Sequence, residues 1–163
     1  MPEFKNMVDL DRALKPLLKD VVNAVAKRVE DKIIANIDEY VYIGRNEYYY
    51  DGSAMPTYEF RESWKSDGAK SIPNGFEAEI YSHYDMMRLD KDTFLHGSYW
   101  GDVRKYLPEI IEEGLSGKLF GEGFWREKRP FFSKTIEQLE SQGLIQKWYI
   151  EEFRKRGLQV QVI

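Results

Sequence analysis

Two histidines, His83 and His96, and three nearby aspartates, Asp85, Asp90 and Asp92, are the residues of this chain best suited to bind a metal. Imidazole and carboxylate groups are ligands of divalent cations. The segment lacks the Gly and the terminal Glu of a calcium-binding loop, and the sequence contains no HExxH helix motif. We therefore predict a polar loop here, with no metal and no cofactor.

Pairs of adjacent carboxylates, Glu112-Glu113 and Glu151-Glu152, are the residues that acid–base catalysis would require. Adjacent positions on a helix point about 100° apart. Neither pair is therefore well placed to share one proton or to flank one glycosidic bond. The spacing favours solvated helix faces for both pairs.

Nucleotide binding and nucleophilic catalysis have no support in the sequence. Gly117-Lys118 has the residue order of a phosphate-binding loop, but Glu112 and Leu119 stand where that motif requires Gly and Ser or Thr. No Gly-x-Ser-x-Gly motif presents a serine nucleophile. We predict that the protein is not an enzyme and has no catalytic residues.

Composition limits the class of protein. The chain has 163 residues, a formal net charge of −4 and no cysteine, which predicts a single domain spanning residues 1–163 without disulfides. The first residues lack the layout of a signal peptide, and no apolar run approaches the ~20 residues of a membrane span. We expect no membrane partner. A weakly acidic chain without a basic run is not typical of a general duplex-DNA binder.

Aromatic residues are abundant, and many fall in predicted loops. The chain contains eleven tyrosines, nine phenylalanines and four tryptophans, and Tyr48, Tyr49 and Tyr50 are consecutive. Three adjacent tyrosines cannot all face one side of a helix or strand. Aromatic and arginine side chains are favoured at protein interfaces. Two interpretations remain open: the aromatic residues form contact surfaces, or they fill a loop-rich core.

The first element that positions these residues is a long helix, roughly Asp9 to Tyr40. Pro16 lies either in its first turn or at a kink. Apolar residues recur every three or four positions and so form one stripe. The stripe consists of Leu14, Leu18, Val21, Val25, Val29, Ile33 and Ile37.

An antiparallel hairpin or short meander is predicted over residues 58–83. Tyr58, Phe60 and Trp64 alternate with polar residues, as in a half-buried strand. A second strand is predicted from the alternation of Phe76, Ala78 and Ile80. Between the two strands, Pro73-Asn74-Gly75 is a strong turn signal.

The rest of the chain predicts a loop over about 84–101, a short helix over about 107–113, a Gly-rich loop over 114–129 and a C-terminal helix over about 130–156. Pro108 and Pro130 suit first-turn positions, and Gly114 suits a helix end. Gly143 is expected to divide the last helix. Its apolar stripe is predicted to contain Phe132, Ile136, Leu139, Ile150 and Phe153, followed by a terminal strand over 159–163. The fold class is α+β, with a small antiparallel sheet packed against a long N-terminal helix and a C-terminal helix, and with long loops.

Three motifs, in this order, resemble those of one protein family. Phe60-Arg61-Glu62-Ser63-Trp64 resembles a Leu-Arg-x-Ser-Ile-like strand, and Tyr106 with 107–114 is similar to a Tyr-x-x-x-Val-Glu-x-Gly-Thr-like segment. Arg129-Pro130-Phe131-Phe132 resembles the Arg-Pro-Phe-Leu motif that opens the last helix. The family is that of the small head–tail connection proteins of long-tailed bacteriophages, the neck or tail-completion proteins. The resemblance covers roughly residues 8–155.

The resemblance implies a structural component of the virion, located in the neck or tail region and in the host cytoplasm during assembly. Copies would form a homo-oligomeric ring between a head-closure or portal-proximal protein and a tail terminator or tail tube protein. DNA would pass through this ring without sequence-specific binding, and ring contacts would be heterologous. Two alternatives are a minor tail or minor capsid protein of a phage and, less favoured, a small cytosolic enzyme that uses the loop between His83 and Asp92. The candidate assembly residues are Trp125, Arg126, Arg129, Pro130, Phe131, Glu112, Glu113, Tyr48, Tyr49 and Tyr50.

Overall fold

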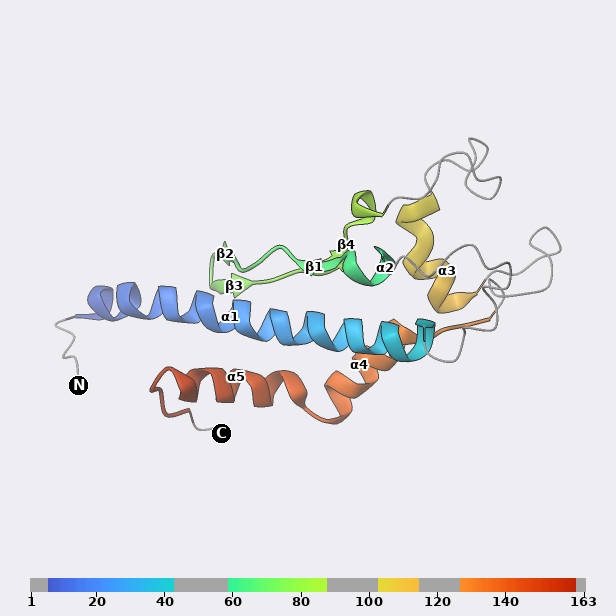
Figure 1. Cartoon of the computed structure of the whole chain (residues 1–163). Helices are drawn as coiled ribbons and strands as arrows, with labels where there is room; N and C mark the ends of the chain where they lie inside the picture. The colour runs from blue at the N-terminus through green and yellow to red at the C-terminus, as the bar shows by residue number, and fades with distance from the viewer. Residues whose placement is uncertain (1–5, 43–58, 88–102, 115–126, 161–163) are drawn as a thin grey trace. The chain divides into compact units, whose positions relative to one another are not determined.

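The computed structural model describes residues 6–42, 59–87, 103–114 and 127–160. Two compact units make up the chain. Unit 1 consists of residues 1–30, 66–80 and 138–163, and unit 2 consists of residues 31–65 and 81–137. Figure 1 shows the long N-terminal helix, the small antiparallel strands and the C-terminal helices, which confirm the predicted α+β class.

The long N-terminal helix α1 spans Met7–Ile37 and continues as a π-helix over Asp38–Tyr42. The helix and its stripe were predicted correctly: Val21, Val25, Ile33 and Ile37 are buried. Pro16 lies inside the helix and not in its first turn. Since α1 contributes its first part to unit 1 and its last part to unit 2, this one helix contains core positions of both units.

Unit 1 contains the hairpin of β2, Lys70–Ile72, and β3, Gly75–Glu77. The two strands are antiparallel with Ser71 opposite Phe76, so the predicted turn at Pro73 and Asn74 is confirmed. Within this unit, Figure 1 shows the hairpin on one side of α1 and helix α5, Leu144–Lys155, on the other.

Polar side chains of α1 hold the chain that leads into this hairpin. The backbone N–H of Ala69 donates to Asn23 Oδ1 at 2.6 Å, and the backbone N–H of Ser66 donates to Glu30 Oε2 at 3.0 Å. Gly68 has a φ of 81°, and a Cβ there would lie 3.4 Å from Asn23 Oδ1. Because buried backbone donors need acceptors, Asn23 and Glu30 fix where the hairpin meets the helix.

The predicted strand from Tyr58 through Trp64 is wrong at its start. Glu59–Glu62 forms the short helix α2, and strand β1 begins at Trp64 and ends at Ser66. Phe60 and Trp64 are four residues apart, a spacing that suits a helical turn as well as an alternating strand. Ser63 completes the turn, since its N–H donates to Glu59 O at 2.9 Å and its hydroxyl donates to Phe60 O at 2.8 Å.

The second predicted strand is two strands in the structure. Phe76 lies in β3, whereas Ile80 opens β4, Ile80–Ser82. β3 pairs with β2, and β4 pairs with β1, so β3 and β4 belong to separate two-stranded sheets. The alternation of Phe76, Ala78 and Ile80 therefore continues across a change of pairing partner, which the period of two does not reveal.

The predicted short helix is confirmed as α3, Leu107–Glu113. Pro108 lies in its first turn. Gly114 ends the helix at a φ of 70°, and its N–H donates to Ile110 O at 2.9 Å. Only glycine adopts this left-handed conformation at little cost, so the predicted stop signal has the expected physical basis.

The C-terminal helix is divided as predicted. Helix α4 spans Phe131–Ser141, α5 follows, and Gly143 between them has a φ of 56°. The predicted terminal strand is absent from the described residues, because Gln159 and Val160 have no regular structure and 161–163 lie outside them.

The predicted apolar stripe of this helix is wrong at two positions. Phe132 and Ile136 are each 40% exposed, whereas Phe131, Thr135 and Leu139 are buried. The buried face follows the same period, shifted by one residue. Thr135 is a polar residue at a core position, and its hydroxyl donates a hydrogen bond to Phe131 O at 2.7 Å. The pattern of apolar residues therefore did not reveal this buried face.

No helix in the described segments has the length and apolar character to cross a membrane.

Candidate functional site

The predicted assembly residues fall into two groups. Trp125, Arg126 and the three tyrosines from Tyr48 to Tyr50 lie outside the described residues, as do His96, Asp90 and Asp92. Glu112, Glu113, Arg129, Pro130 and Phe131 are described, and all five belong to unit 2. An assembly role for any of them stays a prediction.

An aromatic cluster in unit 2 brings together the first and third sequence motifs. Phe131 is fully buried, and its ring centroid lies 5.5 Å from that of Phe60 and 5.6 Å from that of Trp64, both edge-on. Phe132 stacks on Trp64 at 5.8 Å with an interplanar angle of 29°. Edge-to-face and offset-stacked pairs at these distances are favourable geometries for aromatic rings. The cluster fixes the start of α4 against β1 and α2.

Helix α3 provides the second motif and binds the start of α4 through Glu112. The carboxylate accepts hydrogen bonds from the backbone N–H of Phe132 at 2.9 Å and of Ser133 at 3.0 Å, and from the Ser133 hydroxyl. These N–H groups are among the first of α4 and have no partner within the helix. A carboxylate at a helix N-terminus also complements the helix dipole. Glu112 is therefore a capping residue, and the predicted solvated face is wrong for it.

Among the described residues of unit 2, Arg129 is the least exposed charged residue. It is only 1% exposed, its backbone N–H donates to Ile111 O at 3.0 Å, and its carbonyl accepts from Phe131 N–H at 2.7 Å. The backbone of this buried residue thus connects α3 to the start of α4 through hydrogen bonds. Its side chain is not on the surface of unit 2.

Glu113 and Lys128 form an exposed ion pair beside the cap. Lys128 Nζ lies 3.0 Å from Glu113 Oε2, and both side chains are more than 60% exposed. A pair of this kind contributes little to stability. The two adjacent glutamates therefore have different roles, a structural one for Glu112 and a surface one for Glu113.

A shallow hollow opens above the aromatic cluster. It has a volume of about 210 Å³ and is lined by Trp64, Pro108, Glu109, Glu112, Phe131 and Phe132. Its walls are aromatic, and Glu109 adds an exposed carboxylate at its edge. The hollow is smaller than the usual 300–1,000 Å³ site for a small molecule.

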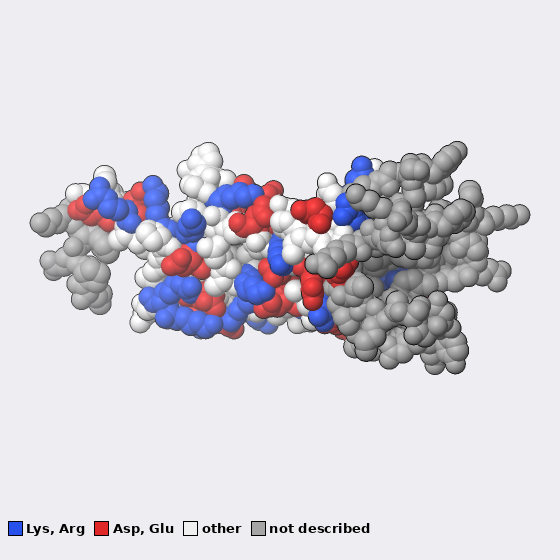
Figure 2. Space-filling model, turned by 45° about the horizontal axis from the view of Figure 1, so that its top comes forward, with Lys and Arg blue, Asp and Glu red and all other residues white. Residues whose placement is uncertain are grey.

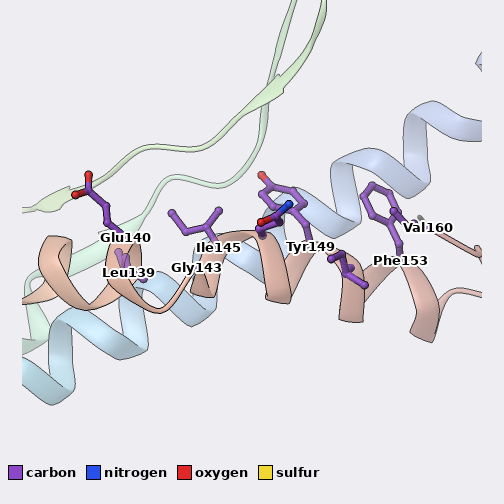
Figure 3. A pocket seen from close by; sticks show the side chains of 9 residues that line it. Leu139, Glu140, Gly143, Ile145, Tyr149, Phe153 and Val160 are labelled. Carbon is purple, nitrogen blue, oxygen red and sulfur yellow. The ribbon is translucent and has the colours of Figure 1, made fainter. Parts of the chain in front are cut away.

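Unit 1 contains a longer apolar groove that the sequence interpretation did not predict. Its volume is about 660 Å³, and Figure 3 shows side chains of α4, α5 and the C-terminal segment around it. Tyr149 stacks on Phe153 at 6.4 Å, and burial raises the pKa of Tyr149. The signal was present in the predicted stripe, where Ile150 and Phe153 were assigned to the core. The groove is lined by Leu139, Glu140, Gly143, Ile145, Gln146, Tyr149, Ile150, Phe153 and Val160.

Glu152 forms the centre of a charged network that attaches α5 to α1. Lys155 Nζ lies 2.6 Å from its carboxylate, Arg156 Nη1 lies 2.7 Å away, and Arg28 Nη2 of α1 lies 3.4 Å away. The hydrogen bonds from Lys155 and Arg156 lower the pKa of Glu152 to about 2, against an opposing effect of burial. Glu152 is buried, so the predicted solvated face is wrong here as well.

The described residues show no arrangement for metal chemistry. In the segments 6–42, 59–87, 103–114 and 127–160, no group of three or more His, Cys, Asp or Glu side chains is placed to hold a metal ion. The ring of His83 stacks on Tyr81 with centroids 4.3 Å apart. Figure 2 shows Lys and Arg interspersed with Asp and Glu over the described part of one face.

One protein-family model matches most of the chain: the family is YomN, and the matched residues are 6–155. No curated protein and no solved structure matches the chain.

Proposed function

Since the chain belongs to the YomN family, which is phage-derived, we propose that it is a structural component of a tailed-phage virion. Its specific role is that of a subunit in the neck or tail-completion ring, which joins the head portal to the tail and surrounds the DNA channel. The ring is a homo-oligomer. It binds a head-closure or portal-proximal protein on one face and a tail terminator or tail tube protein on the other.

The meeting of three separate motifs around Phe131 is the observation that supports this role. The motif at 60–64 contributes Phe60 and Trp64 to the cluster, and the motif at 106–114 contributes the Glu112 cap. The motif at 129–132 begins the helix that both contact. The resemblance to neck proteins thus rests on residues that build one structural region, and not on scattered matches.

The mixed surface charge is compatible with a wall around DNA. A channel wall that attracts phosphates strongly would retain the genome, because each lysine or arginine contact adds a salt-dependent attraction. The net charge of the chain is −4, and acidic and basic side chains are interspersed on the described part of the face in Figure 2. Such a surface lets DNA pass without sequence-specific contacts.

Mixing experiments test the role directly. Purified protein is added to DNA-filled heads and, separately, to tail tubes of the same phage, and association is followed by light scattering and negative-stain electron microscopy. The proposal expects rings at the portal end of the head or at the head-proximal end of the tail. Lack of association with both would contradict it.

The alternative role, a minor tail or minor capsid protein, predicts a different position in the same particle. Decoration along the tail or over the head surface in these images would favour that role. Replacing His83 by Ala addresses the enzyme alternative, since an enzyme based on the 83–92 loop would lose its activity. Head or tail association is expected to survive this change.

A further inference from the structure

Unit 2 presents an exposed apolar surface with an acidic edge, here called the acidic aromatic surface and defined by Trp64, Glu109, Phe132 and Ile136. Phe132 and Ile136 lie four residues apart on α4, which places them on one helix face, and each is 40% exposed. The adjacent hollow of about 210 Å³ is lined by Trp64, Glu109 and Phe132. Two large apolar side chains beside an aromatic hollow are typical of a contact surface.

Trp64 lines the hollow and is itself largely buried. The residue is 6% exposed, and its indole Nε1 is buried with no hydrogen-bond partner among the described residues. A protein segment seated in the hollow would cover the exposed part of Phe132, which stacks on Trp64.

Aromatic rings next to a carboxylate select a positively charged guest. A lysine or arginine side chain is attracted to the face of Trp or Phe and forms an ion pair with a glutamate. Glu109 is exposed and forms no ion pair among the described residues, whereas the Glu112 carboxylate already accepts the hydrogen bonds of the α4 cap. Glu109 is therefore the group available to such a guest.

Unit 1 carries a surface with the complementary chemistry, here called the basic α5 surface and defined by Lys147, Ile150 and Arg154. Lys147 and Arg154 are seven residues apart, about two helical turns, with Ile150 between them on the same face. Both are exposed, and neither forms an ion pair among the described residues. Ile150 also lines the apolar groove of about 660 Å³ (Figure 3).

We infer that the acidic aromatic surface of one copy binds the basic α5 surface of a second copy. Charge complementarity supports this contact, because one surface has a carboxylate beside exposed apolar residues and the other has basic residues beside an apolar groove. Because the two surfaces differ, the contact is heterologous, and its repetition around an axis gives a ring where the rotation closes. The inference rests on the proposed neck function and names the subunit contact within that ring.

Charge reversal tests this contact. Glu109→Lys and Arg154→Glu, each in the full chain, place like charges opposite each other and are expected to weaken self-association by about tenfold or more. The double variant Glu109→Lys/Arg154→Glu carries both reversed surfaces and is expected to recover most of the wild-type association. Sedimentation velocity over a concentration series gives the association constants.

Matched controls come from exposed charges outside both surfaces. Asp85→Lys in unit 2 and Lys19→Glu in unit 1 change the net charge by the same amounts and are expected to leave association unchanged. Far-ultraviolet circular dichroism checks that each variant is folded, which is expected because all four positions are exposed.

Three outcomes overturn the inference. They are a wild-type protein that stays monomeric at its highest soluble concentration, single reversals that associate like wild type, or a double variant no better than the single ones. None of them removes the neck proposal, which fails instead if the protein binds neither heads nor tails. The two results are therefore distinguishable.

Discussion

The carboxylate of Glu112 on α3 accepts a hydrogen bond from the backbone N–H of Ser133 at 3.0 Å, in the first turn of α4. The two residues are 21 positions apart in the chain, and the cap joins two segments that the sequence separates with a Gly-rich stretch. Helices are usually capped by a residue next to their own start. Here the cap comes from another helix, so the stability of α4 depends on the correct placement of α3.

Removing this cap is expected to destabilise the protein measurably. Glu112→Ala should lower the free energy of unfolding by about 1–2 kcal/mol, because first-turn N–H groups of α4 lose their acceptor. Glu113→Ala is the matched control. It breaks only the exposed pair with Lys128 and should cost less than about 0.5 kcal/mol. Urea denaturation of the two variants measures their free energies of unfolding. Equal losses of stability would contradict the roles assigned to Glu112 and Glu113.

The two phenylalanines at the start of α4 provide a second matched pair. Phe131 is fully buried among Phe60 and Trp64, so Phe131→Ala should cost roughly 3–5 kcal/mol. Phe132→Ala removes a side chain that is 40% exposed and should cost only about 1 kcal/mol. Thermal or urea unfolding measures both. A larger loss for Phe132 would mean that the buried face of α4 is assigned to the wrong residues.

The side chain of Arg129 is expected to stabilise the folded state. In the sequence, Arg129 stands at the end of the predicted loop 114–129 as a candidate assembly residue, whereas in the structure it is 1% exposed, with its backbone bonded to Ile111 and Phe131. Arg129→Ala should therefore lower the free energy of unfolding by roughly 2–4 kcal/mol. Lysine should not restore it, since the planar guanidinium is not matched by an ammonium group. Lys128→Ala is the exposed control, and a folded Arg129→Ala protein of normal stability would contradict this prediction.

Much of this architecture was predictable from the sequence, and each failure has its own physical cause. The α1 stripe, the turn at Pro73 and Asn74, and the helix stop at Gly114 follow from local periodicity and backbone preference. The sequence misplaced α2 and the buried face of α4. The spacing of Phe60 and Trp64 suits both a helix and a strand. Thr135 is polar but occupies a core position, so the apolar pattern did not include it.

The candidate surfaces were less predictable than the fold. Glu112 and Glu152 looked like members of solvated pairs, because each has a partner far away in the sequence that spacing does not reveal. These partners are Ser133 for Glu112, and Arg28 for Glu152, which also pairs locally with Lys155 and Arg156. Spacing shows which residues share a helix face, but it does not show which distant segment that face meets. The hollow and the α5 groove arise from such distant contacts and required the structure.

The pH dependence of stability is expected to report the Glu152 network. The pKa of Glu152 is lowered to about 2, from about 4.5 without these partners, by hydrogen bonds from Lys155 and Arg156. A folded-state pKa below the unfolded value gives stability that is fully present above the unfolded pKa and is lost as the pH falls toward 2. Unfolding at pH 7 should therefore require more free energy than at pH 3, by on the order of 1–2 kcal/mol from this residue.

Glu152→Gln isolates this contribution. The variant should be less stable than wild type at pH 7, and the difference should shrink at pH 3, where the wild-type carboxyl begins to lose its advantage. Glu151→Gln serves as control, because it removes the neighbouring charge and retains the Glu152 hydrogen bonds. Urea denaturation at both pH values gives the result, and a constant difference across pH would contradict the assignment.

The central claim is that this chain is a neck or tail-completion subunit, and its position in the mature particle tests that claim most directly. Purified virions of the phage that encodes it are labelled with a gold-conjugated antibody against the protein and imaged by electron microscopy. We expect label confined to the junction between head and tail. Virions that lack the protein, or that carry it only on the head surface or along the tail, would contradict it.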